Sequence, residues 1–160
     1  MKIKHSFETG ISFGLTSGII TTLGLIVGLY AGTRSKAVVI GGILTIAIAD
    51  ALSDALGIHI SEEAEAKHTP REIWEATIAT FIVKLVVSSL FIFPVIFLPT
   101  AMAVGLSVIA GFLAIASFSC YIARKDGSST VHAILEHLIV AAVVVIATYY
   151  VGSWIAKVFQ

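Results

Sequence analysis

The sequence predicts an all-α integral membrane protein with five transmembrane helices. Of its 160 residues, 58% are hydrophobic and only 12% are charged, whereas a soluble domain carries roughly a quarter charged residues. A globule of this length buries only about 70% of its unfolded surface, so this many apolar side chains cannot all be hidden from water. The composition therefore indicates that the protein folds in a lipid bilayer.

Five apolar segments are each long enough to cross the hydrocarbon core, which needs about twenty helical residues. The predicted spans are about 9–31, 37–60, 74–97, 101–123 and 131–158. We expect 1–160 to form a single transmembrane domain, with 61–73 as a short acidic cytoplasmic linker. Pro70 and Pro99 stand near helix starts, where a missing N–H is tolerated, and Pro94 should kink the third span or end it early.

Basic residues outside the spans predict the orientation, because Lys and Arg concentrate in cytoplasmic loops. The side that holds the N-terminus would carry Lys2, Lys4, Lys67, Arg71, Arg124 and Lys125, and the other side Arg34, Lys36 and Lys157. This bias places the N-terminus in the cytoplasm and the C-terminus outside. Lys plus Arg equals Asp plus Glu at ten each, so no net charge indicates a nucleic-acid partner. The compact chain favours a prokaryotic plasma membrane.

The first span is rich in small residues. Gly10, Gly14 and Gly18 recur every four residues and leave one helix face smooth. Such a face lets another backbone approach closely, so we expect this helix to lie at a helix interface rather than to face lipid. The hydroxyls of this span, including those of Ser17 and Thr21, either bond to carbonyls of their own helix or line a polar pathway.

Two carboxylates, Asp50 and Asp54, lie inside the second span on one helix face. Inserting a charged side chain at the bilayer centre costs at least about 2.5–3.5 kcal/mol of free energy. The presence of two carboxylates in this span therefore needs an explanation. One reason is structural, since Lys84 in the third span lies at the depth of Asp50 and can form a buried ion pair with it. The other reason is a functional site.

A functional site would centre on Asp54, which lies at roughly the depth of Ser17, Glu136 and His132. His132 and Glu136 are i, i+4 neighbours and can share one face. Carboxylate, hydroxyl and imidazole ligands suit a divalent cation such as Mn²⁺ or Fe²⁺, and such groups also carry protons in membrane relays. The alternative for His132 and Glu136 is a helix end solvated by headgroup water.

An acidic run that includes Glu62 and Glu65 continues the second helix out of the membrane. It is either a solvated helix end or a collector of cations. The sequence has no C-x-x-C, no H-E-x-x-H and no Gly-rich phosphate loop. We therefore expect a membrane transporter rather than an enzyme, with no tightly bound cofactor.

Three stretches taken together resemble the vacuolar iron transporter family of five-span divalent-metal transporters. They are S-G-I-I-T-T-L-G-L-I-V-G-L (17–29), A-D-A-L-S-D-A-L-G-I-H-I-S-E-E-A-E (49–65) and A-T-Y-Y-V-G-S-W-I (147–155). The resemblance implies a homodimer that exports Fe²⁺ or Mn²⁺ from the cytoplasm in exchange for protons. The transport path would be flanked by the first helices of both subunits.

The chain departs from the family pattern in ways that bear on the site. Ser17 stands where the family usually has Asp, and Asp54 stands where it usually has Met. The 61–73 linker is too short for the cytoplasmic helical domain of well-studied members. These departures describe a short, divergent member in which one carboxylate has moved from the first helix to the second.

The resulting prediction is a proton-coupled exporter with Asp54 as the main metal site. Asp50 and Lys84 would form a charge-compensated element beside it, and Ser17 and Thr21 would line the pathway. Glu136 with His132 would form a second group near the cytoplasmic mouth, while Glu62 and Glu65 would gather cations. The alternatives are a non-transporting membrane scaffold with Asp50–Lys84 as a structural ion pair, and a transporter of another small solute.

Overall fold

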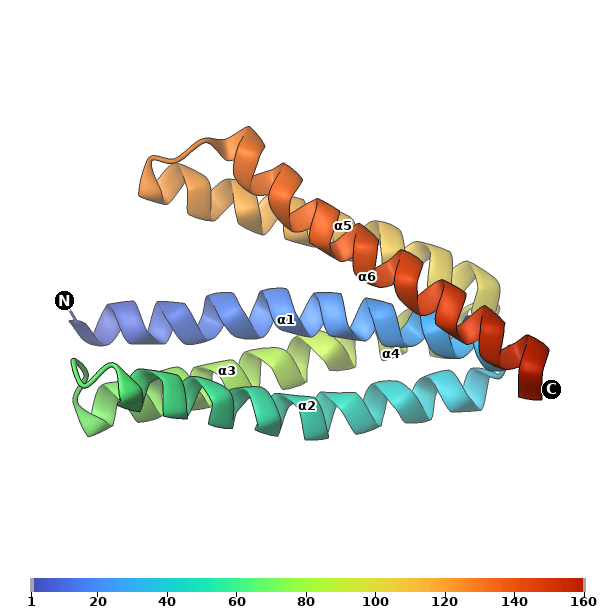
Figure 1. Ribbon diagram of the computed structural model, residues 1–160, viewed down its shortest axis with the longest axis horizontal. Helices are drawn as coiled ribbons and strands as arrows, with labels where there is room; N and C mark the ends of the chain where they lie inside the picture. The colour runs from blue at the N-terminus through green and yellow to red at the C-terminus, as the bar shows by residue number, and fades with distance from the viewer. Residues whose placement is uncertain (1, 160) are drawn as a thin grey trace. The chain divides into compact units, whose positions relative to one another are not determined.

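The computed structural model describes residues 2–159 and their side chains from Ser6 onward, so the side chains of Lys2 and Lys4 lie outside it. Over this range the chain forms helices only, with no strand (Figure 1). They are α1 (Lys2–Thr33), α2 (Lys36–Ala64), α3 (Pro70–Leu90), α4 (Ile92–Phe97), α5 (Thr100–Asp126) and α6 (Thr130–Phe159). Five helical segments are long and apolar enough to cross a membrane, with α3 and α4 forming one of them. The predicted fold class is confirmed.

The third span is interrupted before Pro94, as the sequence predicts. Helix α3 ends at Leu90 and α4 begins at Ile92. Pro94 has no N–H to donate to the carbonyl of Leu90, and its ring crowds that carbonyl. The amide of Phe91 instead bonds to the carbonyl of Ser88 at 3.2 Å, which tightens the last turn of α3.

A capping box fixes the start of α3. The Thr69 amide donates to the Glu72 carboxylate at 2.7 Å, and the Glu72 amide donates to Thr69 Oγ1 at 3.3 Å. Pro70 occupies the first turn, where its missing N–H removes no helical bond. Reciprocal bonds of this kind satisfy two amides that a helix start would otherwise leave unpaired. The α2–α3 linker therefore ends at a well-defined point.

The chain divides into two compact units. The first comprises Met1–Thr22 and Ile43–Phe91, and the second comprises Leu23–Gly42 and Ile92–Gln160. The first unit thus holds the N-terminal part of α1, most of α2 and all of α3. The second holds the end of α1, the start of α2, and α4 to α6.

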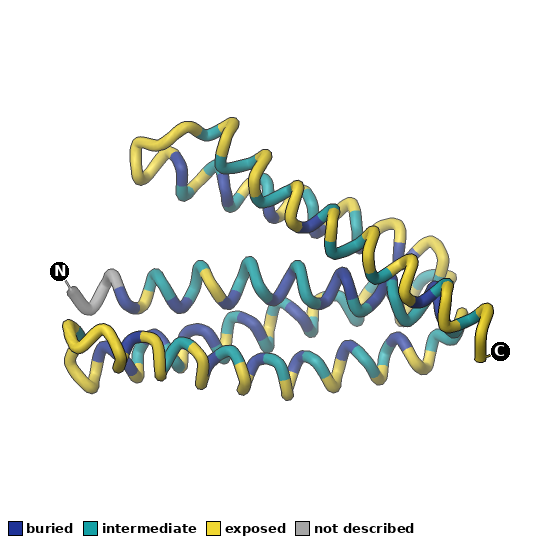
Figure 2. Tube along the Cα trace, viewed as in Figure 1, coloured by how far each residue is buried: buried dark blue, intermediate teal, exposed yellow. Residues whose placement is uncertain are grey.

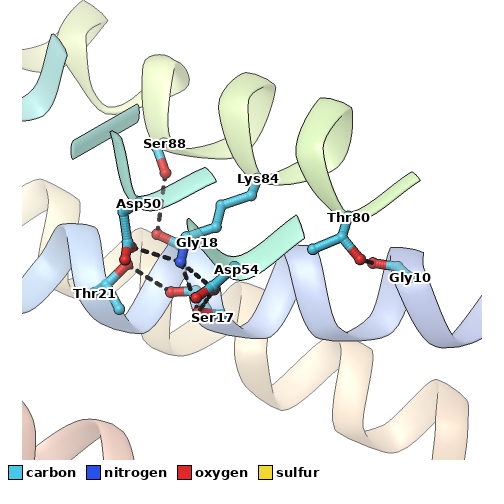
Figure 3. Close-up of polar contacts among 9 residues, drawn as sticks. All are labelled: Gly10, Ser17, Gly18, Thr21, Asp50, Asp54, Thr80, Lys84 and Ser88. Carbon is cyan, nitrogen blue, oxygen red and sulfur yellow. Dashed lines mark hydrogen bonds and ion pairs between the residues drawn. The ribbon is translucent and has the colours of Figure 1, made fainter. Parts of the chain in front are cut away.

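In the first unit, the glycine face of α1 packs against α3. A Cβ added to Gly14 would lie 2.8 Å from the Thr80 carbonyl oxygen, and one added to Gly18 would lie 3.3 Å from Cγ of Lys84. The Thr80 hydroxyl donates to the Gly10 carbonyl at 3.3 Å (Figure 3). The predicted helix interface is therefore present, and in this unit it is formed within one chain.

We expect Gly14→Ala to destabilise the protein, although alanine favours helix formation by about 1 kcal/mol over glycine. The added methyl group would overlap the α3 backbone at Thr80, and overpacking of this kind costs about 1–3 kcal/mol. Gly57→Ala is the matched control, because a Cβ at Gly57 meets nothing within 4 Å. Unfolding in detergent should show a lower midpoint for Gly14→Ala only, and equal midpoints would contradict this packing.

In the second unit, α1 and α6 also meet through small residues. A Cβ on Gly28 would lie 3.3 Å from Thr148, and a Cβ on Gly152 would overlap the Gly28 carbonyl. Most other residues of α6 are exposed or half-buried (Figure 2), and only 6% of its most apolar 18-residue stretch is buried. Exposed aliphatic residues along a spanning helix are what contact with lipid requires.

Candidate functional site

A buried lysine in the first unit gathers three oxygen-bearing side chains. Lys84 of α3 has no exposed side-chain surface, and its Nζ contacts Asp50 and Asp54 of α2 and Ser17 of α1 (Figure 3). The Nζ atom lies 2.5 Å from Asp50 Oδ2 and 2.9 Å from Ser17 Oγ. These four residues, from three helices, are called the Lys84 cluster below.

The two carboxylates differ in how they are held. Asp54 Oδ2 accepts hydrogen bonds from Lys84 Nζ and, at 2.6 Å, from the Ser17 hydroxyl. Asp50 Oδ2 forms only an ion pair with Lys84, because the contact is not aligned as a hydrogen bond. Asp54 is therefore fixed by two donors, while Asp50 keeps capacity to accept another partner.

The expected Asp50–Lys84 ion pair is present. Lys84 also contacts the Asp54 carboxylate directly, a contact that the sequence did not predict. With every group ionised, two carboxylates and one ammonium leave the cluster a formal charge of −1. Charge compensation in the cluster is therefore incomplete.

The cluster lies deep in the membrane-crossing part of the chain. Asp50 is the central residue of α2, and Lys84 lies at the middle of the span Pro70–Phe97. The side chains of Asp50 and Asp54 keep 28% and 21% of their surface exposed. Carboxylates at this depth face water-filled cavities or polar partners rather than hydrocarbon. The exposed edge of the cluster therefore needs a polar environment.

The two hydroxyl residues of α1 behave differently. Ser17 accepts a hydrogen bond from Lys84 and donates one to Asp54, so its proton and one of its two lone pairs are used within the cluster. Thr21 donates to the Ser17 main-chain carbonyl at 2.8 Å, a bond within its own helix. Ser17 thus belongs to the cluster, whereas Thr21 shows the intrahelical bonding that sequence reasoning left as the alternative.

The predicted group on α6 lies in the second unit. Glu136 and His132 are both exposed side chains of that helix. The neighbouring His137 lies with its Nδ1 2.7 Å from the hydroxyl of Ser119 on α5. The convergence of Glu136 and His132 with Asp54 stays a prediction.

The acidic end of α2 is only partly solvated. Glu65 is exposed, but Glu62 is 8% exposed and its Oε2 lies 3.5 Å from His68 Nε2. His68 also approaches Glu65 at 3.7 Å, and its Nδ1 lies 3.3 Å from the Ser6 hydroxyl. Sequence reasoning missed this contact because the chain turns back after α2, with Ala66 at a φ of 52°. The linker is therefore tied to the start of α1.

The cluster offers oxygen ligands but is not a complete metal site by its acidic side chains alone. Among side chains 6–159, no group of three or more His, Cys, Asp or Glu residues is placed to hold a metal ion. Asp50, Asp54 and Ser17 would supply three oxygens, and hard divalent cations usually take further oxygens from water or carbonyls. A cation here would therefore keep part of its water shell or take ligands from elsewhere.

Five membrane-crossing helices and a carboxylate–lysine cluster within them define a multi-pass membrane protein with ionisable groups at bilayer depth, a combination typical of transporters. The model of the VIT family matches residues 11–75, so this part of the chain is similar to that family. The matched range contains Ser17, Asp50 and Asp54, whereas Lys84 lies beyond it. No curated protein and no solved structure matches the chain.

Proposed function

We propose that this protein is a proton-coupled exporter of a divalent transition metal, Fe²⁺ or Mn²⁺, from the cytoplasm. Asp54 is the central metal ligand, with Asp50 and Ser17 completing the protein's oxygen donors. Glu62 and Glu65 gather cations at the cytoplasmic end of α2, and Glu136 with His132 forms a second carboxylate–imidazole group. The exchange with protons follows the resemblance to the vacuolar iron transporter family.

The observation that carries the proposal is the convergence of three oxygen groups on one buried point, inside the range that the family model matches. The three oxygens surround the Lys84 nitrogen, itself a cation, and one carboxylate charge remains uncompensated. Placing ionisable groups at this depth is costly, and ionisable residues within membrane spans typically mark ion pathways or proton relays. The partly exposed carboxylates give an arriving ion a face to approach.

The proposal includes an orientation and an assembly. The N-terminus lies in the cytoplasm and the C-terminus outside, in a prokaryotic plasma membrane, and the distribution of basic residues supports this orientation. Two copies form a homodimer with their first helices flanking the path. A second copy could also supply the ligands that Asp50, Asp54 and Ser17 leave open.

The second candidate is a non-transporting scaffold, and the completeness of the Lys84 contacts favours it. The ammonium donates hydrogen bonds to Asp54 and Ser17 and forms an ion pair with Asp50, and Ser17 ties α1 to the same group. Such a cluster specifies how α1, α2 and α3 pack, whether or not an ion is carried. A flux measurement separates the two candidates.

The test uses the full chain in liposomes that contain a pH-sensitive dye. An inward or outward Mn²⁺ or Fe²⁺ gradient should drive proton movement in the opposite direction and metal movement down its gradient. Empty liposomes measure the leak, and Ca²⁺ and Na⁺ gradients measure selectivity. Flux equal to the leak for every ion would contradict the exporter, and metal flux without proton flux would contradict the coupling.

A further inference from the structure

We propose that Lys84 is a tethered cation that occupies the metal site and must be displaced before a metal ion can bind. The inference deepens the proposed function, on which it rests, by naming the residue that sets the affinity and selectivity of the site. The proposal concerns where the ammonium lies.

The position of the ammonium carries the proposal. Its nitrogen lies 2.5 Å from Asp50 Oδ2 and 2.9 Å from Ser17 Oγ, with Asp54 Oδ2 also in contact. Oxygen ligands surround hard divalent cations at about 2.0–2.6 Å. The three oxygens therefore already surround the point that a cation would take, and a modest contraction would convert an ammonium site into a metal site.

The lysine stem is held so that the ammonium remains there. Lys84 has no exposed side-chain surface, and its Cγ lies within 3.3 Å of the position that a Cβ on Gly18 would take. The Ser88 hydroxyl, one turn along α3, reaches the Gly18 carbonyl at 3.5 Å. Close packing of α1 on α3 thus fixes the stem of Lys84. Because the ammonium is tethered at the site, its effective concentration there is high, and a metal ion must compete with it.

This arrangement explains selectivity by charge. A monovalent ion would replace the +1 charge of the ammonium by another +1 charge and would lose its hydration shell. The carboxylates would therefore attract it little more strongly than they attract the ammonium. A divalent ion brings twice the charge to two carboxylates, so it gains roughly twice the attraction at equal distance. Lys84 should therefore exclude Na⁺ and K⁺ and lower the affinity for divalent metals to a level that permits release.

The experiment measures Mn²⁺ binding to the purified full chain by the loss of the free-ion paramagnetic resonance signal. Lys84→Met removes the ammonium and keeps an unbranched side chain that is one heavy atom shorter. Asp50→Asn with Lys84→Met restores the wild-type formal charge of −1 without the ammonium, and Lys84→Arg keeps a cation. Each protein is measured with and without excess Na⁺.

Lys84→Met should bind Mn²⁺ at least about tenfold more tightly than wild type, and Na⁺ should now compete. The double variant should bind at least as tightly as wild type although it has lost a carboxylate, and Lys84→Arg should show no gain. If Lys84→Met fails to fold, the comparison is made with the double variant instead. The double variant leaves only Asp54 without the ammonium, whereas Lys84→Met leaves both carboxylates without it.

The outcomes separate this inference from the proposed function. Wild-type binding with no gain in Lys84→Met or in the double variant would overturn the inference and leave the exporter standing. If Lys84→Met binds Mn²⁺ and the wild type does not, the result would support the tethered cation but count against transport by the wild type. If no variant binds Mn²⁺, both the inference and the exporter are overturned.

Discussion

Replacing Asp50 and Asp54 together by Asn is expected to lower the free energy of unfolding by about 3–5 kcal/mol, the cost of leaving a buried charge without its partners. Lys84 would then keep only the Ser17 hydroxyl and the new amide oxygens around an ammonium that has no exposed surface. Amide oxygens accept hydrogen bonds but carry no charge to balance it. The effect should exceed that of either single replacement, since each one leaves the other carboxylate in place.

The measurement is reversible unfolding in mixed micelles, followed by circular dichroism. Glu63→Gln is the control, because Glu63 is exposed at the end of α2 and should change stability by less than about 0.5 kcal/mol. A double variant as stable as this control would mean that Lys84 reaches water or another anion, which would remove the basis for the Lys84 cluster.

Asp54→Asn is expected to abolish metal transport and leave the fold intact. Mutating a residue that hydrogen-bonds to a metal ligand typically lowers metal affinity or activity by about 10- to 100-fold. Loss of the central carboxylate ligand itself should therefore lower transport by more than this. The fold should survive because Lys84 keeps its ion pair with Asp50 and its hydrogen bond to Ser17. Metal uptake by liposomes measures the loss, and the unfolding midpoint shows that the protein remains folded.

Asp126→Asn provides the matched control for this variant. Asp126 is an exposed carboxylate at the end of α5, outside the Lys84 cluster. Its removal should leave metal uptake at the wild-type rate. Normal transport by Asp54→Asn would show that Asp54 is not the transport site, even if transport of divalent metal is confirmed.

The sequence predicts the helices well because hydropathy and proline chemistry act locally. Long apolar runs place the five spanning segments, and Pro94 ends α3 at Leu90 as expected. Equal depth in neighbouring spans is also enough to anticipate the Asp50–Lys84 ion pair. These features depend on spacing along one chain and on the thickness of the membrane.

Sequence reasoning could not predict that Lys84 contacts Asp54 and Ser17 as well. Those contacts depend on how α1, α2 and α3 are rotated about their axes, which packing between helices decides. A signal was nevertheless present, because Thr80, Lys84 and Ser88 repeat every four residues and form a polar stripe on α3. This stripe packs along the glycine face of α1, and all three residues are buried.

In the proposed transporter, intramembrane oxygen ligands form a cation site that Lys84 occupies until metal arrives. Anomalous diffraction from crystals of the full chain soaked in Mn²⁺ tests it most directly. We expect a peak bounded by Asp54, Asp50 and Ser17, with the Lys84 ammonium moved out of contact with both carboxylates. A peak confined to the Glu62–Glu65 end of α2, with Lys84 still bonded to Asp54, would contradict it.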